Sequence, residues 1–482
     1  MTETISISQA IRDKAQADPD RPAVSCGDRT VTRAEFHRRT NRLARAYAAL
    51  GVTHGSYVTI GLPNSIEFYE AAFAAWKLGA TPQPISYRLP DREREAIVEL
   101  AHPSLVVGAD PAKHPGFTVV PAGWEPDPSI PDDDLPDVIA PAWKAPTSGG
   151  STGRPKLIVA ADPGVIMVGQ PNQGLKVDGS ALIPGPLYHN APFAFSCQAI
   201  CHGNHVTVLA KFDAEATLAE VERRQADWVL LVPTMMLRIW RLPEDVRNRY
   251  DLSSLQTVWH MAAPCPAWLK EAWINWLGGD KIWELYAGTE AQAVTIVRGD
   301  EWMAHRGSVG RVLVGEMKIL DPNTFEELPA GEQGEVFMRS NRGATYRYLG
   351  AEPRLSPDGW ESLGDMGWFD ADGYLYLGDR RADMILSGGA NIYPAEVEAA
   401  IDEHPAVRSC AVIGIPDDDL GSRVHAIVQA VEPVDIDELR TFLAERIVRY
   451  KIPRTFEFVD EPVRDDAGKV RRSALREDRS SS

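Results

Sequence analysis

The sequence predicts an α/β protein with two parts: a large N-terminal domain of packed α/β sheets with a β-rich subregion, and a small, mobile α+β C-terminal domain. Three observations favour this fold. Helical and strand patterns alternate over the first 100 residues, which is typical of largely parallel sheets. Short strand patterns with turn signals follow over 316–340. After Asp379 the pattern changes to a unit of about 100 residues, the size of a small domain.

The N-terminal elements begin with an amphipathic segment. Residues 33–50 have helical periodicity and end at Gly51, a helix stop signal. Residues 57–62 form a strand-like run, and residues 65–78 again have helical periodicity. This order predicts helix, strand and helix in succession.

The middle of the chain starts with residues 110–146, whose many Pro and Asp residues predict a surface connection. Short apolar runs predict strands at 157–160, 207–210 and 228–232, and residues 218–226 predict a helix.

In the C-terminal unit, the sequence pattern predicts helices at 395–403 and 435–449 and strands at 410–415 and 425–431. We place the domain boundary near 381–383. The expected domains are therefore 1–381 and 382–482.

Composition limits the kinds of partner. Of 482 residues, 50 are Lys or Arg and 68 are Asp or Glu, which gives a net charge of −18. Such an acidic chain is poorly suited to broad nucleic-acid binding, so an anionic ligand must be held locally. The N-terminus shows no signal-peptide pattern and no segment is apolar enough to span a membrane, so we expect a cytoplasmic protein.

The five cysteines are odd in number and irregularly spaced, which favours reduced thiols over a disulfide framework. Cys197, Cys201, His202 and His205 lie close together in the sequence. They lack the paired spacing of structural zinc sites, so buried thiols are favoured over a metal centre.

A glycine- and hydroxyl-rich segment, 148–156, precedes the expected strand at 157–160. Its glycines let the backbone approach phosphate oxygens, while exposed N–H groups, hydroxyls and Lys156 supply donors and charge. It is not a Walker A loop, because Lys156 stands between Pro155 and Leu157. Composition alone leaves a phosphate loop and a flexible surface turn equally open.

Four further segments follow in order: 286–290, 363–367, 378–398 and 466–469. Together with the glycine-rich segment, they resemble the motifs of the adenylate-forming superfamily of acyl- and aryl-CoA synthetases, peptide-synthetase adenylation domains and luciferases. The resemblance extends over almost the whole chain. It implies ATP, Mg²⁺ and coenzyme A as cofactor and co-substrates.

The resemblance implies roles for individual residues. Lys469 would bridge carboxylate and phosphate oxygens in the transition state, Glu290 would bind Mg²⁺, and His189 would be a gate histidine. Glu290 and Lys469 are counted as catalytic with Thr289 and His189. The ATP-binding residues implied are Ser148, Gly149, Gly150, Ser151, Thr152, Gly153, Lys156, Ala262, Ala263, Pro264, Tyr286, Ala287, Gly288, Thr289, Asp365 and Arg380.

Within the ATP site, Tyr286 would stack on adenine and Asp365 would accept the ribose hydroxyls. Taken one at a time, these residues have ordinary structural explanations, such as a core aromatic, a turn carboxylate or a basic tail.

The C-terminal domain of the resembled family rotates between two half-reactions. Ser387, Gly388 and Gly389 would line the coenzyme A tunnel, and Ala382 aligns with the hinge, where many relatives carry Asp or Lys. The phosphate loop has Ser148-Gly149-Gly150 where the common pattern starts with Thr-Ser-Gly. This variant resembles the bile-acid-CoA-ligase-like branch, which suggests an alicyclic or steroid-derived acid.

The expected acyl pocket is apolar, small or soft and contains no Lys or Arg, which favours a hydrophobic acid of lipid or fatty acid metabolism. Its residues are Tyr188, His189, Asn190, Phe193, Thr234, Met235, His260, Met261 and Gly288. The function expected is an ATP-dependent acid:CoA ligase that acts on a fatty, aryl or steroid-type acid. An enzyme that loads a carrier-protein thiol and an inactive nucleotide-binding protein remain alternatives, and a homodimer stays open.

Overall fold

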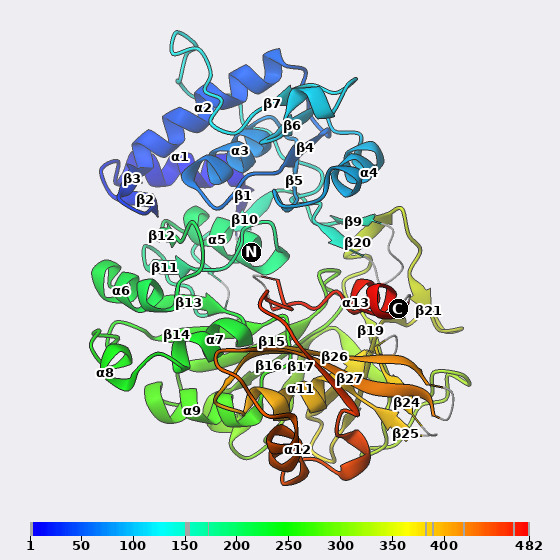
Figure 1. The fold of residues 1–482 in the computed structure, drawn as a ribbon. Helices are drawn as coiled ribbons and strands as arrows, with labels where there is room; N and C mark the ends of the chain where they lie inside the picture. The colour runs from blue at the N-terminus through cyan, green and yellow to red at the C-terminus, as the bar shows by residue number, and fades with distance from the viewer. Residues whose placement is uncertain are drawn as a thin grey trace.

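The computed structural model describes residues 3–149, 155–171, 173–380, 383–387, 390–417, 420–465 and 468–480. The N-terminal part contains a parallel sheet with the strand order β5-β4-β6-β7 (Figure 1). A capping box of Thr32 and Glu35 starts the second helix, and the third helix is buried almost throughout. The elements of this part are α1 (Ile7–Ala17), α2 (Arg33–Ala49), β4 (Tyr57–Ile60), α3 (Ile66–Lys77), β5 (Thr81–Pro84), α4 (Asp91–Ala101), β6 (Leu105–Val107) and β7 (Val119–Val120).

A long mixed sheet crosses the centre of the molecule, with the order β18-β19-β22-β23-β17-β16-β15-β14-β13-β11-β12-β2-β3. Strands from β2 to β15 pair in parallel, and the sheet turns antiparallel from β15 to β16 onward. The strands are β2 (Pro22–Cys26), β3 (Arg29–Thr32), β11 (Ser180–Ile183), β12 (His205–Val208), β13 (Trp228–Leu231), β14 (Thr257–Met261), β15 (Ile282–Ala287), β16 (Val294–Arg298), β17 (Ser308–Val314), β18 (Glu316–Leu320), β19 (Gly334–Arg339), β22 (Glu361–Phe369) and β23 (Leu375–Arg380), with β21 (Arg354–Leu355) beside β22.

Both faces of the parallel half are covered, so two separate apolar cores flank it. One core includes Phe193 of α5, and the other includes Met235 of α7 and Trp273 of α9. The helices are α5 (Asn190–Cys201), α6 (Ala214–Arg224), α7 (Pro233–Trp240), α8 (Glu244–Arg247), α9 (Ala267–Leu277) and α10 (Gly299–Trp302).

Two small sheets complete the large part. The strands β8 (Thr147–Gly149), β9 (Pro155–Ala160) and β20 (Tyr346–Leu349) pair in the order β20-β9-β8. The other sheet joins β1 (Thr4–Ser6) to β10 (Val165–Met167).

The C-terminal residues form an α+β unit with its own core. Figure 1 shows this unit, coloured orange to red, beside the antiparallel half of the central sheet. Its elements are β24 (Ile385–Ser387), β25 (Ala390–Ile392), α11 (Pro394–Asp402), β26 (Val407–Asp417), β27 (Gly421–Ala430), α12 (Ile436–Ala444), β28 (Thr455–Phe458) and α13 (Arg472–Ser480).

The predicted fold class is confirmed, including the β-rich subregion, which is formed by β18, β19, β22 and β23. The helix expected over 435–449 is too long, because α12 ends at Ala444. The surface connection at 110–146 has little regular structure. Its backbone carbonyls are held by Arg42 and Arg45 of α2.

Candidate active site

The glycine-rich segment connects β8 to β9, which is where a phosphate loop is expected. Gly150, Ser151, Thr152 and Gly153 lie outside the described residues. Lys156 of β9 is described, with its Nζ 4.0 Å from the centroid of the Tyr348 ring. The same Nζ lies 3.6 Å from Oε1 of Glu290, so β9 brings a cation to the segment after β15.

Glu290 is a buried carboxylate that neighbouring residues hold in place. Tyr348 donates its hydroxyl to Oε1 of Glu290 at 2.5 Å, and Thr345 donates to the Glu290 backbone carbonyl at 2.6 Å. Burial, followed by the charge of Glu290, raises the pKa of Tyr348 and keeps that hydroxyl a donor. A buried carboxylate oxygen beside a phosphate-type loop is the kind of hard ligand that Mg²⁺ prefers, so the residues fit this ion.

The nucleoside side of the site joins β15 to β22. Tyr286 donates its hydroxyl to Oδ2 of Asp365 at 2.8 Å. The backbone of Asp365 is aligned with that of Arg380 in the β22–β23 register. A side chain at Gly288 would overlap Leu363, which explains why a glycine is needed there. Ala287 ends β15, and Thr289 follows two residues later, after Gly288.

The segment after β14 holds another part of the expected ATP site, namely Ala262, Ala263 and Pro264. Ala262 has a φ of 72°, a left-handed conformation that alanine adopts only at a cost. The strained turn redirects the chain where the parallel strand ends.

The expected acid gate lies at the start of α5. His189 is the N-cap residue, and Tyr188 packs against its ring with the centroids 4.5 Å apart. Nε2 of His189 is buried and has no hydrogen-bond partner among the described residues. Burial and, to a lesser extent, the charge of Lys469 lower the pKa of His189 to about 3.

The catalytic-lysine segment of the C-terminal unit lies against α7 of the large part. Gly468 has a φ of 74°, and a side chain there would overlap Thr234 of α7. Lys469 donates its backbone N–H to Oδ1 of Asp465 at 2.9 Å. Arg464 donates to the Gly468 carbonyl at 3.1 Å and to Oε2 of Glu398 at 2.6 Å, which ties the segment to α11.

Two residues expected in the acyl pocket are fully buried among other side chains. Phe193 is fully buried and stacks on Trp76, with the ring centroids 5.8 Å apart. His260 is fully buried, and its Nδ1 lies 3.8 Å from Glu284, which is paired with Lys270 of α9. His260 therefore belongs to the core between the sheet and α9, whereas Met261 belongs to the core on the opposite face.

The expected hinge and most of the expected coenzyme A tunnel are not described by the structure. Ala382, Gly388 and Gly389 lie outside the described residues, and Ser387 ends β24.

Cys197 and Cys201 are buried free thiols of α5, and His205 is hydrogen-bonded to Ser25 at 2.8 Å. The only group of metal-type ligands found among the described residues is His305, Asp370 and Asp372, far along the chain from these cysteines.

Sequence reasoning missed Lys144. Its side chain is buried, and its Nζ donates to Oδ1 of Asn190. Burial lowers the pKa of Lys144 to about 7, against the opposing charges of Glu290 and Asp162. Lys144 stands outside every motif, so the only available signal was its position just before β8.

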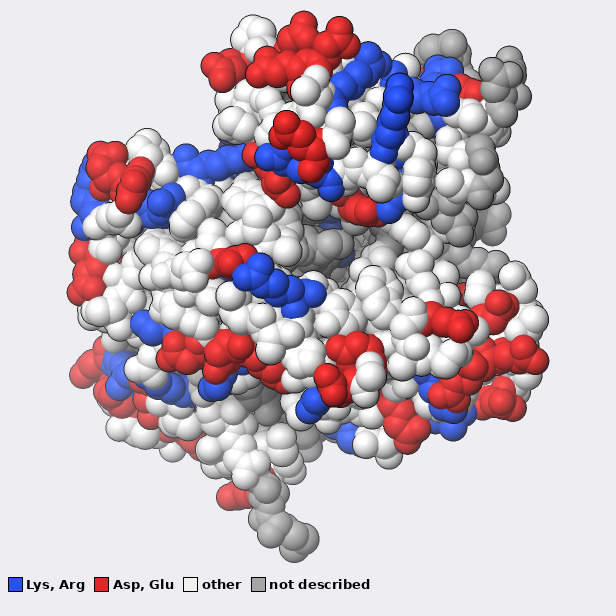
Figure 2. Space-filling view, turned by 90° about the horizontal axis from the view of Figure 1, so that it is seen from below, with Lys and Arg blue, Asp and Glu red and all other residues white. Residues whose placement is uncertain are grey.

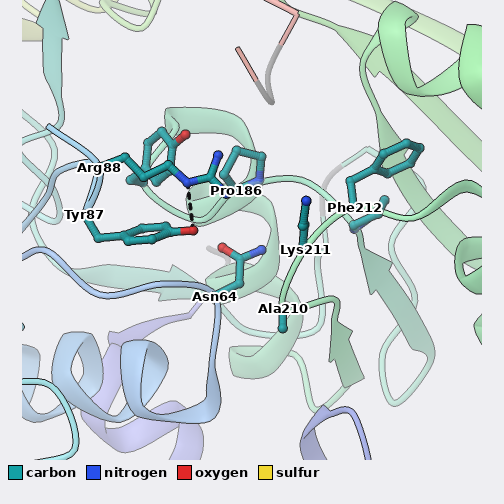
Figure 3. Close-up of a pocket in the computed structure, with 9 residues that line it drawn as sticks. Asn64, Tyr87, Arg88, Pro186, Ala210, Lys211 and Phe212 are labelled. Atoms are coloured by element: carbon teal, nitrogen blue, oxygen red, sulfur yellow. Dashed lines mark hydrogen bonds between the residues drawn. The ribbon is translucent and has the colours of Figure 1, made fainter. Parts of the chain in front are cut away.

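A second pocket lies beside the gate (Figure 3). Its wall carries two cations, Arg88 and Lys211, and Arg88 donates to the hydroxyl of Tyr87 at 2.9 Å. Among the described residues, Lys211 has no carboxylate within salt-bridge distance. The remaining residues of the wall are Asn64, Pro184, Pro186, Tyr188, Ala210 and Phe212. Elsewhere, Figure 2 shows acidic and basic side chains interspersed over one face, without a broad basic patch there.

The large part and the smaller C-terminal unit match two family models in chain order. The AMP-binding enzyme family model matches residues 11–349, and the model of the AMP-binding enzyme C-terminal domain matches residues 396–469. The chain belongs to the AMP-binding enzyme family. It is an AMP-forming acid–thiol ligase that uses ATP, Mg²⁺ and coenzyme A.

Its relatives match over nearly their whole length. A feruloyl-CoA synthase from Amycolatopsis sp is 32% identical over 96% of this chain and 97% of its own. A fatty acid–[acyl-carrier-protein] ligase, ScoC, from Streptomyces coeruleorubidus is 30% identical over 96% and 94%. The o-succinylbenzoate CoA synthetase (MenE) of Bacillus subtilis, solved with the acyl-adenylate intermediate OSB-AMP, has a TM-score of 0.80 and 25% identity over 98% of each chain. It has also been solved with ATP and magnesium.

None of the helices in the described part of the chain is both long and apolar enough to cross a membrane.

Proposed function

We propose that this protein joins a hydrophobic carboxylic acid to coenzyme A in two half-reactions. The first forms acyl-AMP and pyrophosphate, and the second forms acyl-CoA and AMP. The observation that carries the proposal is the close packing of Gly468 against Thr234 of α7, because it brings the neighbouring Lys469 from the C-terminal unit to the large part, where its charge acts on His189.

In adenylation, a carboxylate oxygen of the acid forms a bond to the α-phosphorus of ATP, and the bond to pyrophosphate breaks. The phosphate loop, residues 148–156, and Lys156 hold the phosphates, while Asp365 and Tyr286 hold the ribose and adenine. Lys469 stabilises the negative charge that builds up on the α-phosphoryl oxygens. Glu290 would hold Mg²⁺, which supplies positive charge next to the phosphates.

In thioester formation, the thiol of coenzyme A attacks the acyl carbon and AMP leaves. We assign the pantetheine tunnel to Ser387, Gly388 and Gly389, and the hinge to Ala382, with domains at 1–381 and 382–482. The pocket beside the gate supports coenzyme A as the acceptor, because Arg88 and Lys211 suit the phosphates of its nucleotide.

The acid we propose is apolar. Tyr188 packs against His189 at the gate, the expected pocket contains no Lys or Arg, and the relatives act on aryl and fatty acids by their names. A steroid-type acid rests on the Gly149-Gly150 pair alone. The five free cysteines support a reducing compartment, so we place the protein in the cytoplasm.

The test is pyrophosphate release followed by thioester analysis. The acids are ferulate, 2-succinylbenzoate, a long-chain fatty acid and a steroid side-chain acid, each with ATP, Mg²⁺ and coenzyme A. We expect acyl-CoA and stoichiometric pyrophosphate with at least one of them. Pyrophosphate release without acyl-CoA would overturn coenzyme A as the acceptor, and no release with any acid would overturn the proposal.

The second candidate is transfer of the acyl group to a carrier-protein thiol, which the similarity to ScoC favours. Supplying an acyl carrier protein in place of coenzyme A separates the two. Replacing Arg88 and Lys211 with Ala should raise the KM for coenzyme A and leave adenylation unchanged.

A further inference from the structure

Lys144 is a buried cation at the edge of the site that none of the steps above uses. Its residue is 7% exposed, its Nζ donates to Oδ1 of Asn190, and the Trp143 ring centroid lies 4.5 Å away. Burying an ammonium is costly unless it is paired and hydrogen-bonded. Asn190 is therefore the contact that makes this position tolerable for a lysine.

This contact fixes the orientation of the Asn190 amide. A lysine ammonium has three donors and no acceptor, so the carbonyl oxygen of Asn190 must face it. The amide nitrogen, Nδ2, then points to the opposite side. Among the described residues, Nδ2 has no hydrogen-bond partner, and Asn190 is only half-buried. Two N–H donors are thus held at the first residue of α5 and directed away from Lys144.

The surroundings of these donors favour an anion. The 12-residue helix α5 begins here without a side-chain cap, so its first-turn N–H groups and the positive end of its dipole face outward. The adjacent His189 has a buried Nε2 without a partner in the described part of the chain. Lys469 acts on His189 from the C-terminal unit. Donors and positive charge from three segments therefore meet beside the gate.

We infer that Lys144 is a positioning residue that holds the Asn190 amide as a donor to the carboxylate of the acid during adenylation. The inference rests on the proposed function and deepens it. One carboxylate oxygen accepts the N–H of Asn190 while the other attacks the α-phosphorus. Lys144 and Asn190 together recognise the carboxylate of the acid and not its acyl tail. The adenylation of acids with different tails therefore depends on them equally.

The discriminating variant is Asn190→Asp, which keeps an acceptor for Lys144 but removes the Nδ2 donor. With ferulate, or the acid of the panel with the highest turnover, we expect a roughly 10- to 100-fold higher KM for the acid. The KM for ATP should stay unchanged. Asn190→Ala should act in the same direction.

Lys144→Met tests the indirect role. If Lys144 acts through Asn190, this variant raises the KM for the acid, and combining it with Asn190→Ala adds nothing further. Lys77→Met is the matched control. Lys77 is 2% exposed and donates to Oδ1 of Asn41 at 2.6 Å, but it lies in α3, away from the site. It should keep the kcat and both KM values.

The inference is overturned if Asn190→Asp leaves the KM for the acid unchanged, or raises the KM for ATP equally. Additive effects of Lys144→Met and Asn190→Ala would also overturn it. In all of these cases the wild-type protein still forms acyl-CoA, so the proposed function survives. A wild-type protein that releases no pyrophosphate with any acid overturns both.

Discussion

Replacing Glu398 with Gln should loosen the segment that carries Lys469. Glu398 is 3% exposed, and its carboxylate accepts hydrogen bonds from Arg464 at 2.6 Å and from Arg472 at 2.8 Å. The backbone N–H of Val412 also donates to it, at 2.8 Å. Because Arg464 in turn donates to the Gly468 carbonyl, Glu398 anchors the catalytic segment through a single guanidinium.

The loss of stability expected for Glu398→Gln follows from leaving two buried guanidinium groups without their shared carboxylate. Breaking a buried ion pair by removing one partner costs about 3–5 kcal/mol. Burial alone would raise the pKa of Glu398, but the charges of Arg464 and Arg472 outweigh it and lower the pKa. The carboxylate therefore stabilises the fold above its unfolded-state pKa. That contribution is lost as the pH falls through the lower folded-state pKa.

The assay is hydrogen exchange measured by mass spectrometry, because the described C-terminal unit contains no tryptophan to report its unfolding. In Glu398→Gln, amides of α11 and β26 should exchange faster at neutral pH, and the difference from wild type should shrink at acid pH. Adenylation should slow as well. Glu396→Gln is the control, since Glu396 is an exposed partner of Lys451 and should cost less than about 1 kcal/mol. Equal exchange in Glu398→Gln and wild type would refute the anchoring role.

Three further outcomes follow from the site. Lys469→Ala should slow adenylation roughly 100-fold or more. Thioester formation from a preformed acyl-adenylate, measured by chromatography, should stay intact. Equal loss in both half-reactions would contradict the assigned role. His260→Leu should raise the thermal midpoint of unfolding more at pH 5 than at pH 8. Burial lowers the pKa of His260 to about 4, so at pH 5 the unfolded chain binds a proton that the native state does not bind. A raised KM for the acid would instead indicate that His260 lines the acyl pocket. Gly288→Ala should raise the KM for ATP, because the added side chain overlaps Leu363. Adding Leu363→Ala to this variant should partly restore the wild-type KM for ATP. If it does not, the overlap is not the cause.

The contiguous motifs could be predicted from the sequence because their chemistry lies within a few residues. Tyr286 is hydrogen-bonded to Asp365, and Glu290 lies beside Lys156. Two residues hold Glu290, Tyr348 of β20 and Thr345 just before that strand, and neither has a local sequence signal.

The placement of His260 and Phe193 could not be predicted for a different reason. All five residues of β14 are buried, because helices cover both faces of the parallel sheet. Such a strand lacks the alternation of apolar and polar residues that would reveal its faces. The helix α5 is likewise apolar on most sides, so the sequence does not show that Phe193 faces Trp76.

The net charge of −18 makes the origin of the local cations important. Lys144 and Lys156 come from the large part, whereas Lys469 comes from the C-terminal unit, so the positive charge around the gate is complete only when the two parts are docked. Among the described residues, the ion pair between Arg471 and Glu93 joins the parts, but the Arg471 side chain is 65% exposed. Such a pair contributes less than about 1 kcal/mol. Arg241 of the large part also donates to the backbone carbonyls of Asp402 at 2.7 Å and Arg408 at 3.2 Å, so direct hydrogen bonds hold the parts as well. We expect bound ATP and acid to add to this docking energy, and the release of pyrophosphate to weaken it. The loss of negative charge in the first half-reaction would then itself free the C-terminal unit for the second.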